Sequence, residues 1–177
     1  MTGLSEAGVQ KRFRDAMARL GAAVNIVTTD GPAGRHGLTA SAVCSVTDTP
    51  PTVLVCVRQQ AGAHDVLKAN GALCVNVLAG RHENLSAKFG RSGLSVDQRF
   101  ADATWKRLAT GAPALADAAA SLDCRIVGVT EVGTHTVFFC EVQDMVAAAE
   151  PEGLIYFNRT YHHIGPIPQS QASEARA

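Results

Sequence analysis

The side chains that could do chemistry form none of the common catalytic or metal-binding patterns. His162 and His163 are adjacent, but no carboxylate or cysteine stands at helical spacing from them, so we expect no metal site. Gly31, Gly34 and Gly37 are spaced G-x-x-G-x-x-G, which differs from the dinucleotide fingerprint, and the sequence has no Walker loop. Carboxylates paired for acid–base work are also missing. An enzyme without these parts would take its chemistry from a bound cofactor.

The five cysteines are odd in number, and no two of them have C-x-x-C spacing. Three of them, Cys56, Cys74 and Cys140, stand within apolar runs, where a thiol is typical of a small core side chain. This pattern predicts reduced thiols and therefore a cytoplasmic protein.

Composition narrows the class of protein further. The chain has 177 residues, of which 46% are hydrophobic, and this is enough for one domain with a real core. Lys plus Arg equals Asp plus Glu at 16 each, so the charge balance gives no basic face for a nucleic acid. Basic residues interrupt the N-terminus, and no apolar run reaches about 18 residues, so we expect neither a secretory signal nor a membrane span.

Hydrophobic periodicity predicts one helix followed by a β-rich body. Residues 5–20 carry an apolar stripe of Val9, Phe13, Met17 and Leu20 at helical spacing. Strands are predicted at 23–29, 38–46, 52–57, 73–78 and 154–157, short helices at 63–70 and 83–89, and a hairpin at 122–132 and 135–146. The polar stretch 90–111 is expected to be a long loop or lid.

The strands are short and do not alternate regularly with long helices. A doubly wound parallel sheet is therefore disfavoured, and an antiparallel barrel with flanking helices is the expected fold class. We expect one domain over residues 1–168. The polar residues 169–177 are expected to form a disordered tail.

A set of segments in a fixed order resembles the flavin reductase family, which has a split-barrel FMN-binding fold. It begins with Thr39 to Pro51, a run of small residues that ends in two prolines. The other segments are residues 73–78, 85–89, 99–100, 133–135 and 154–162. The likeness is greatest to the reductase components of two-component monooxygenases, first those of pyrimidine utilisation and then those of 4-hydroxyphenylacetate hydroxylation.

The resemblance implies an antiparallel split β-barrel that forms a homodimer, with flavin near the subunit interface. It implies FMN as the flavin, with FAD as the alternative, and NADH as the reductant, with NADPH as the alternative. Hydride would pass from the nicotinamide to the flavin, and the protein would hold the two rings together. Reduced FMN would then leave to supply a separate flavin-dependent monooxygenase.

The same resemblance assigns cofactor-binding residues to the first half of the chain. Small side chains let a backbone approach a flat ring, and the flavin ring is expected against Ser41, Ala42, Val43, Cys44 and Ser45. The ordinary alternative is a strand of small residues at a barrel corner.

Residues after the next strand are expected to hold the flavin phosphate. The resemblance assigns this role to Arg58, Gln59 and Gln60. Residues 61–63 are Ala-Gly-Ala, where family members carry hydroxyl side chains. The alternative for Arg58 is a solvated surface charge.

Later segments complete the expected site. Lys88 is expected near the phosphate and Phe89 near the ring, although core packing is an equal alternative for Phe89. His135 is the candidate catalytic residue, in contact with the nicotinamide cofactor, and the alternative is an exposed histidine at a turn. Arg159 and Tyr161 are expected to cover the nicotinamide side.

Two other classes of protein remain open on the sequence alone. A non-catalytic flavin- or haem-binding barrel would bind flavin without oxidising NADH. An enzyme similar to pyridoxamine-phosphate oxidase would need a basic cluster for its substrate phosphate, and the sequence shows no such cluster.

Overall fold

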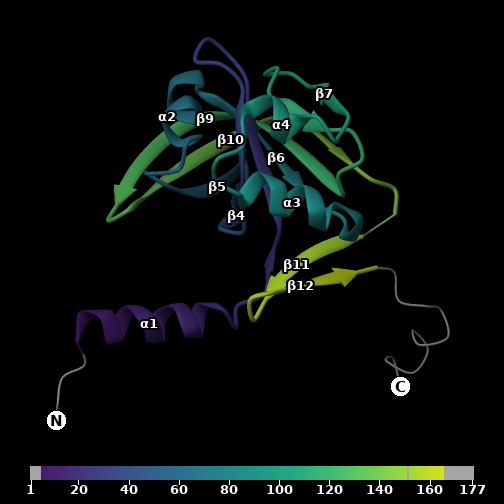
Figure 1. Ribbon diagram of the computed structural model, residues 1–177. Helices are drawn as coiled ribbons and strands as arrows, with labels where there is room; N and C mark the ends of the chain where they lie inside the picture. The colour runs from purple at the N-terminus through teal and green to yellow at the C-terminus, as the bar shows by residue number, and fades with distance from the viewer. Residues whose placement is uncertain (1–4, 151, 166–177) are drawn as a thin grey trace.

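The computed structural model describes residues 5–150 and 152–165, which are built around a curled antiparallel sheet (Figure 1). The seven strands of this sheet lie in the order β3-β2-β6-β9-β10-β5-β4. They are β2 (Asn25–Thr29), β3 (His36–Ala40), β4 (Val43–Asp48), β5 (Pro51–Arg58), β6 (Ala72–Val77), β9 (Ala120–Val132) and β10 (His135–Ala147). All neighbours in it pair antiparallel, which confirms the predicted mainly-β, antiparallel fold class.

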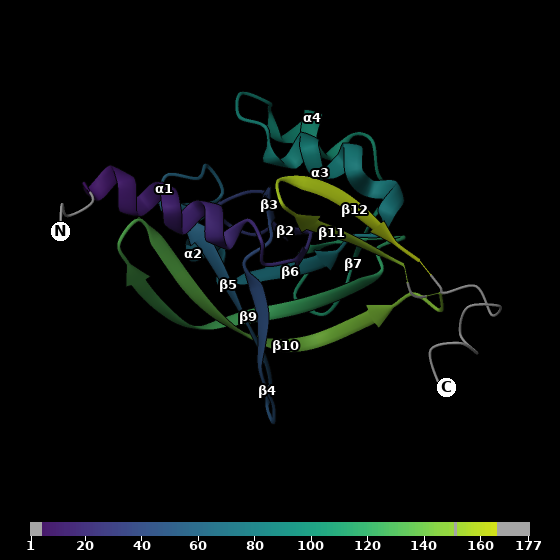
Figure 2. The same ribbon diagram turned by 90° about the horizontal axis from the view of Figure 1, so that it is seen from below.

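The segment between β3 and β4 closes the barrel. These strands are consecutive in sequence, yet they form opposite edges of the sheet. The chain crosses between the edges at Ser41 and Ala42, where the carbonyl of Ala42 accepts a hydrogen bond from the Cys56 amide at 2.9 Å. The prediction of one strand over 38–46 was therefore wrong, because one continuous strand cannot run along both edges of a sheet. Figure 2 shows β4 projecting from the barrel.

The sheet buries alternate residues on one face. In β5, Val53, Val55 and Val57 are buried, while their neighbours are more exposed, as expected for a period of two. These valines pack with Phe138 from β10, which is fully buried. The predicted hairpin of β9 and β10 is confirmed, with Gly133 in the left-handed conformation at φ 56° in its turn.

Residues 90–111 combine turns with two short regular elements, so the prediction of one long loop was only partly right. They contain α4 (Val96–Phe100) and β7 (Trp105–Arg107), and β7 pairs with β8 (Pro113–Leu115). Ser95 and Gln98 form a capping box that starts α4. Trp105 packs on Phe100 with ring centroids 4.9 Å apart. These local signals outweigh the polar composition of the stretch.

Three further helical segments surround the sheet. They are α2 (His64–Asn70), the 3₁₀ turn η1 (Gly80–His82) and α3 (Glu83–Gly90). Gly71 ends α2 in the left-handed conformation at φ 65°. The helices predicted at 63–70 and 83–89 are confirmed.

A small second sheet, missed in part by the sequence prediction, lies below the barrel in Figure 1. It consists of β1 (Ala22–Ala23), β11 (Gly153–Phe157) and β12 (Thr160–Ile164). The hairpin turn between β11 and β12 places both Asn158 and Arg159 at positive φ, 48° and 65°. Two-residue hairpin turns of this kind usually carry glycine, so this turn gave no clear signal.

Helix α1 (Glu6–Met17) confirms the predicted N-terminal helix but not a buried stripe. Val9, Phe13, Met17 and Leu20 are 45–64% exposed, and the helix has no buried residue. Figure 1 shows α1 running outward from the base of the barrel. No helix in the described ranges is long and apolar enough to cross a bilayer.

Candidate active site

A cavity of about 580 Å³ lies between β3, the segment after β5 and the C-terminal end of α3. We call it the cationic cavity. Its lining consists of residues from three stretches and one residue of α4. They are residues 36–39, Arg58 and 60–63, 89–94, and Arg99.

The ionisable groups that line the cationic cavity are all basic. They are His36, Arg58, Arg91 and Arg99, and no carboxylate is among the lining residues. Arg58 Nη2 donates to Gln60 Oε1 at 2.8 Å, and within residues 5–150 and 152–165 no carboxylate forms an ion pair with Arg58 or Arg91. Grouped, uncompensated cations favour a bound anion. The four residues come from separate segments, so their grouping cannot be read from the sequence.

Arg99 fixes one wall of this cavity. It is 8% exposed, and its guanidinium donates to the carbonyls of Lys88, Phe89 and Arg91 at 3.1, 2.8 and 2.6 Å. It thereby satisfies carbonyls at the end of α3, which have no partner within the helix. Its Nε is buried and has no partner in the described part of the chain. Residues 99–100 were noted in the sequence, but a lone arginine in a short helix carries no signal of this role.

Phe89 packs in the core, as the alternative for it predicted, and it also lines the cationic cavity. Its side chain is 2% exposed and packs edge-on against Phe100, with centroids 5.1 Å apart. One ring edge faces Gly37 on β3. A Cβ at residue 37 would lie 2.7 Å from Phe89 Cε1, so glycine is required for this approach.

A second hollow of about 330 Å³ adjoins the cationic cavity, since Thr39 and Gly90 line both. We call it the aromatic hollow. It is lined also by Val24, Ser41, Tyr156, Arg159 and Tyr161. Tyr161 Oη lies 3.1 Å from Ser86 Oγ, and Thr39 Oγ1 donates to the Ser86 carbonyl at 2.6 Å. The structure thus brings together Ser41, predicted at the flavin ring, with Arg159 and Tyr161, predicted on the nicotinamide side.

Arg159 is held in an unfavourable backbone conformation beside this hollow. Its φ is 65°, and its Nη2 lies 2.5 Å from Asp15 Oδ1 on α1. Hydrogen bonds from Lys11 and Arg159 lower the pKa of Asp15 below its usual value. The two-residue turn between β11 and β12 requires this positive φ, and the turn thereby places Arg159 beside the hollow.

Other predicted residues do not line either hollow. Ala42, Cys44 and Ser45 are exposed, Val43 is half-buried, and all four lie at or beside the edge strand β4. Gln59 is half-buried, and its backbone N–H donates a hydrogen bond to the Thr134 carbonyl at 3.0 Å.

His135 begins β10 directly opposite Arg58 on β5. Its ring is exposed, and Nδ1 lies 2.9 Å from Thr134 Oγ1. It therefore stands beside the cationic cavity but outside its lining.

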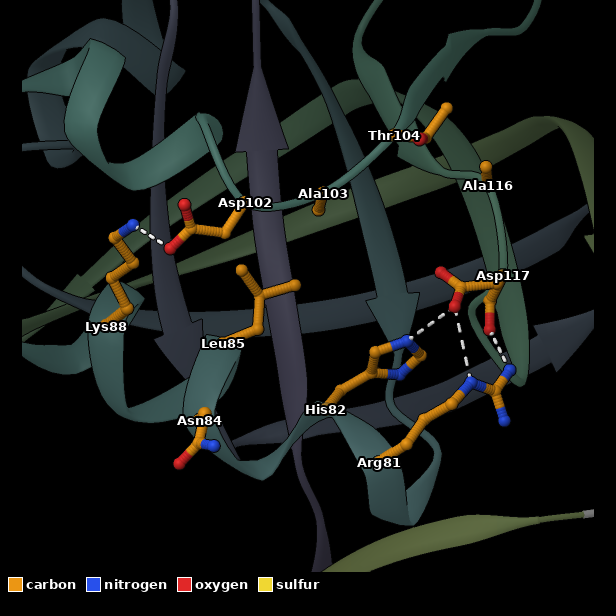
Figure 3. A pocket seen from close by; sticks show the side chains of 10 residues that line it. All are labelled: Arg81, His82, Asn84, Leu85, Lys88, Asp102, Ala103, Thr104, Ala116 and Asp117. Atoms are coloured by element: carbon orange, nitrogen blue, oxygen red, sulfur yellow. Dashed lines mark hydrogen bonds and ion pairs between the residues drawn. The ribbon is translucent and has the colours of Figure 1, made fainter.

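Lys88 lines a different cavity, of about 610 Å³, on another face of α3 (Figure 3). We call it the paired cavity, because its charges neutralise one another. Lys88 pairs with Asp102, and Arg81 Nε lies 3.2 Å from Asp117 Oδ2. His82 Nε2 also lies 3.2 Å from that oxygen. Burial raises the pKa of Asp117, but hydrogen bonds from His82 and Arg81 outweigh it and lower the pKa overall.

The buried thiols are not arranged as nucleophiles. Burial raises the pKa of Cys140 to about 12, and burial raises the pKa of Cys74 and Cys124 further. These thiols stay protonated near neutral pH, which agrees with a role in core packing. In the described ranges no group of three His, Cys, Asp or Glu side chains is placed to hold a metal ion.

Asn76 is also structural. Its side chain is fully buried in β6, where Nδ2 donates to the Ile26 carbonyl at 3.0 Å and Oδ1 accepts from the Leu115 amide at 2.7 Å. A buried amide satisfied at both ends stabilises the sheet and leaves no group free for a ligand.

A curled antiparallel sheet with a cationic cavity beside an aromatic hollow suits a flat cofactor that carries a phosphate. Comparison with known proteins agrees with this class. Residues 17–165 match the model of the flavin reductase like domain, and the chain belongs to that family. The predicted family resemblance and split-barrel fold are confirmed.

Individual relatives cover most of the chain. An FMN reductase (NADH) RutF of Variovorax paradoxus (strain S110) is 57% identical over 156 residues, which is 88% of this chain and 86% of that protein. Among solved structures, the NADH:FAD oxidoreductase SgcE6 of Streptomyces globisporus C-1027, in complex with NAD and FAD fragments, is 28% identical, with a TM-score of 0.83. That match covers 93% of this chain and 98% of the other.

A third match is the styrene monooxygenase flavin reductase of Pseudomonas putida S12. It is 26% identical, with a TM-score of 0.78, and the match covers 89% of this chain and 99% of that protein.

Proposed function

We propose that this protein is an NADH-dependent FMN reductase that supplies reduced FMN to a separate monooxygenase. The observation that carries this function is that the cationic cavity adjoins the aromatic hollow, with Thr39 and Gly90 lining both. Relatives named FMN reductase (NADH) at more than 50% identity support the choice of FMN and NADH. The styrene monooxygenase reductase supports a monooxygenase partner.

The residues present fit a flavin mononucleotide. The orphaned Nε of buried Arg99 and the cations Arg58 and Arg91 suit its phosphate. Tyr156, Tyr161 and the small Ser41 suit the flat ring and its polar edge. When bound, FMN supplies a ring that accepts a hydride from the reduced nicotinamide.

The protein's own groups bind and orient the two cofactors. Arg58 and Arg91 neutralise phosphate charge, while Arg99 keeps the end of α3 in place so that Gly90 and Phe89 form the wall between the hollows. Orientation of this kind supplies much of the rate in a reaction that needs no protein nucleophile. It also accounts for the protonated thiols and the missing catalytic triad.

We propose further that the protein is a homodimer. The apolar stripe of α1 is exposed along its length, and Val127, Val129 and Val132 of β9 are 40–61% exposed. A stripe this apolar is ordinarily covered, and a second copy would cover it. His135 does not line the cationic cavity of its own chain. In a homodimer it could instead contact the nicotinamide cofactor at the site of the second subunit.

Light scattering tests the dimer. The wild type should have twice the mass of one chain, and Phe13→Glu should shift the mass toward a monomer, since it places a charge in the stripe. Lys11→Ala on the opposite side of α1 is the matched control. A monomeric wild type would contradict the dimer.

A nicotinamide oxidation assay tests the reductase. Purified protein should oxidise NADH when FMN is present, and the loss of nicotinamide absorbance measures the rate. Parallel assays with NADPH and FAD rank the alternatives. Binding of FMN with no oxidation of either nicotinamide would instead identify a non-catalytic flavin-binding barrel.

A dialysis chamber tests the diffusible flavin. Reductase and monooxygenase are separated by a membrane that only FMN crosses, and substrate oxidation should proceed in the second chamber under low oxygen. Flavin retained by the reductase through turnover would overturn supply by diffusion.

The role of His135 is tested with His135→Ala. If His135 contacts the nicotinamide cofactor, the KM for NADH should rise more than the KM for FMN. An unchanged KM for NADH would remove His135 from the site.

A further inference from the structure

His36 lies in the cationic cavity, facing a segment that has no side-chain donor of its own. Residues 61–63, which also line the cavity, are Ala-Gly-Ala. A Cβ built on Gly62 would lie 3.4 Å from His36 Nε2, which places the imidazole directly beside that backbone. Gly62 has no side chain to cover Nε2, and both His36 and Gly62 line the cavity.

The hydrogen bonds of His36 determine which ring nitrogen carries the proton. The Gly37 amide donates to His36 Nδ1 at 2.9 Å. A backbone N–H can only donate, so Nδ1 must accept, and the neutral ring then carries its proton on Nε2. The contact of Nδ1 with the Gly37 carbonyl is longer, 3.3 Å, and the shorter bond decides the tautomer. His36 therefore presents an N–H donor to the cavity.

No ionisable group that lines the cavity can accept a hydrogen bond from His36 Nε2, so this N–H is available to a bound anion. The other ionisable groups lining the cavity are the guanidinium groups of Arg58, Arg91 and Arg99, which cannot accept a hydrogen bond. The neighbouring Arg35 points elsewhere, since it pairs with Asp97 at 2.9 Å and lies over the Phe100 ring.

We propose that His36 Nε2 donates a hydrogen bond to the phosphate of FMN and so helps the protein distinguish FMN from riboflavin. This inference rests on the proposed function. In this proposal His36 supplies the side-chain hydrogen-bond donor to the phosphate that residues 61–63 cannot supply.

Flavin binding tests the proposal without measuring turnover. Dissociation constants for FMN and riboflavin are measured by quenching of flavin fluorescence. His36→Ala should weaken FMN binding about tenfold, the effect of losing one charge-assisted hydrogen bond, and leave riboflavin binding unchanged. His36→Gln, whose amide keeps a donor, should retain part of the preference. His162→Ala, which removes an exposed histidine of β12 outside the cavity, is the matched control.

A second-site variant separates loss of a donor from loss of packing. Gly62→Ser places a hydroxyl beside the position of Nε2, and its backbone is not in the left-handed conformation. In the His36→Ala background, Gly62→Ser should restore most of the FMN affinity. Circular dichroism and thermal unfolding confirm that each variant is folded.

The outcomes distinguish this inference from the proposed function. An unchanged ratio of FMN to riboflavin affinity in folded His36→Ala overturns the role of His36 and leaves the reductase standing. Equal weakening of both flavins also overturns it, since the phosphate would not be involved. A wild type that binds neither flavin overturns the proposed function and this inference together.

Discussion

The two cavities that α3 lines differ in how their charges are balanced. In the paired cavity, Lys88 and Arg81 each have a carboxylate partner from the chain. In the cationic cavity, Arg58 and Arg91 have no carboxylate partner in residues 5–150 and 152–165, and Arg99 is bound only to carbonyls. The paired cavity is the larger by volume, about 610 against 580 Å³.

Size therefore does not distinguish the two cavities, whereas charge balance does. Cations grouped without counter-charges repel one another, which costs stability unless an anion binds. In the paired cavity the carboxylates of the chain already neutralise the cations, so no bound anion is required there. The following variants test the packing and the charge balance of the two cavities, and those with a flavin titration test which cavity takes the flavin.

Arg99→Ala should have the largest effect. It removes three hydrogen bonds to carbonyls at the end of α3 and should lower the free energy of unfolding by about 3 kcal/mol. FMN binding should also weaken, because the wall formed by Phe89 and Gly90 loosens. Urea unfolding and flavin titration measure the two effects.

Arg107→Ala is the control for Arg99→Ala, since this exposed arginine pairs with Asp30 at 2.7 Å away from both hollows. It should change stability by less than about 1 kcal/mol. Equal losses in the two variants would show that Arg99 has no special structural role.

Gly37→Ala should have the next largest effect. The new methyl group would meet Phe89 Cε1 at 2.7 Å and the Val27 carbonyl at 3.1 Å, so the ring must move. Overpacking of this kind costs about 2 kcal/mol, and thermal unfolding measures it. Gly21→Ala, with 3.7 Å to its nearest atom, should be close to neutral. A neutral Gly37→Ala would show that the ring is free to shift.

A pair of charge-removing variants compares the cavities directly. Arg58→Ala should weaken FMN binding about tenfold through the lost phosphate contact and leave riboflavin unaffected. Lys88→Ala should change neither, since Lys88 pairs with Asp102 in the other cavity. If Lys88→Ala weakens FMN as much as Arg58→Ala does, the division between the cavities fails, and the sequence-based place of Lys88 near the phosphate is supported.

Asp117→Asn should have the smallest effect, and one that depends on pH. The folded protein lowers the pKa of Asp117, so its carboxylate stabilises the fold above the ordinary pKa of 3.8. That contribution is lost as the pH falls through the lowered folded value. The wild type should exceed the variant by less than about 1 kcal/mol near neutral pH, since the group is largely solvated. Urea unfolding across the acid range should show the two converging; a constant difference would mean that the charge is not involved.

The strands of the core were predictable from the sequence because each is a local pattern. β5 and β6 are apolar runs, and the β9–β10 hairpin is marked by Gly133. The β3–β4 boundary could not be predicted, because a crossing between sheet edges depends on how the whole sheet curls. The turn at Asn158 and Arg159 was missed because its residues adopt positive φ without glycine.

The site divides in the same way. By its own residues and their order, the sequence predicted the family and the antiparallel barrel, and it singled out five residues that line the two hollows: Ser41, Arg58, Phe89, Arg159 and Tyr161. Only the tertiary structure decided that His36, Arg58, Arg91 and Arg99 form one cavity and that Lys88 belongs to another. The physical reason is that charge compensation acts through space. Whether a basic residue is neutralised or left for a ligand depends on which distant segments fold against it.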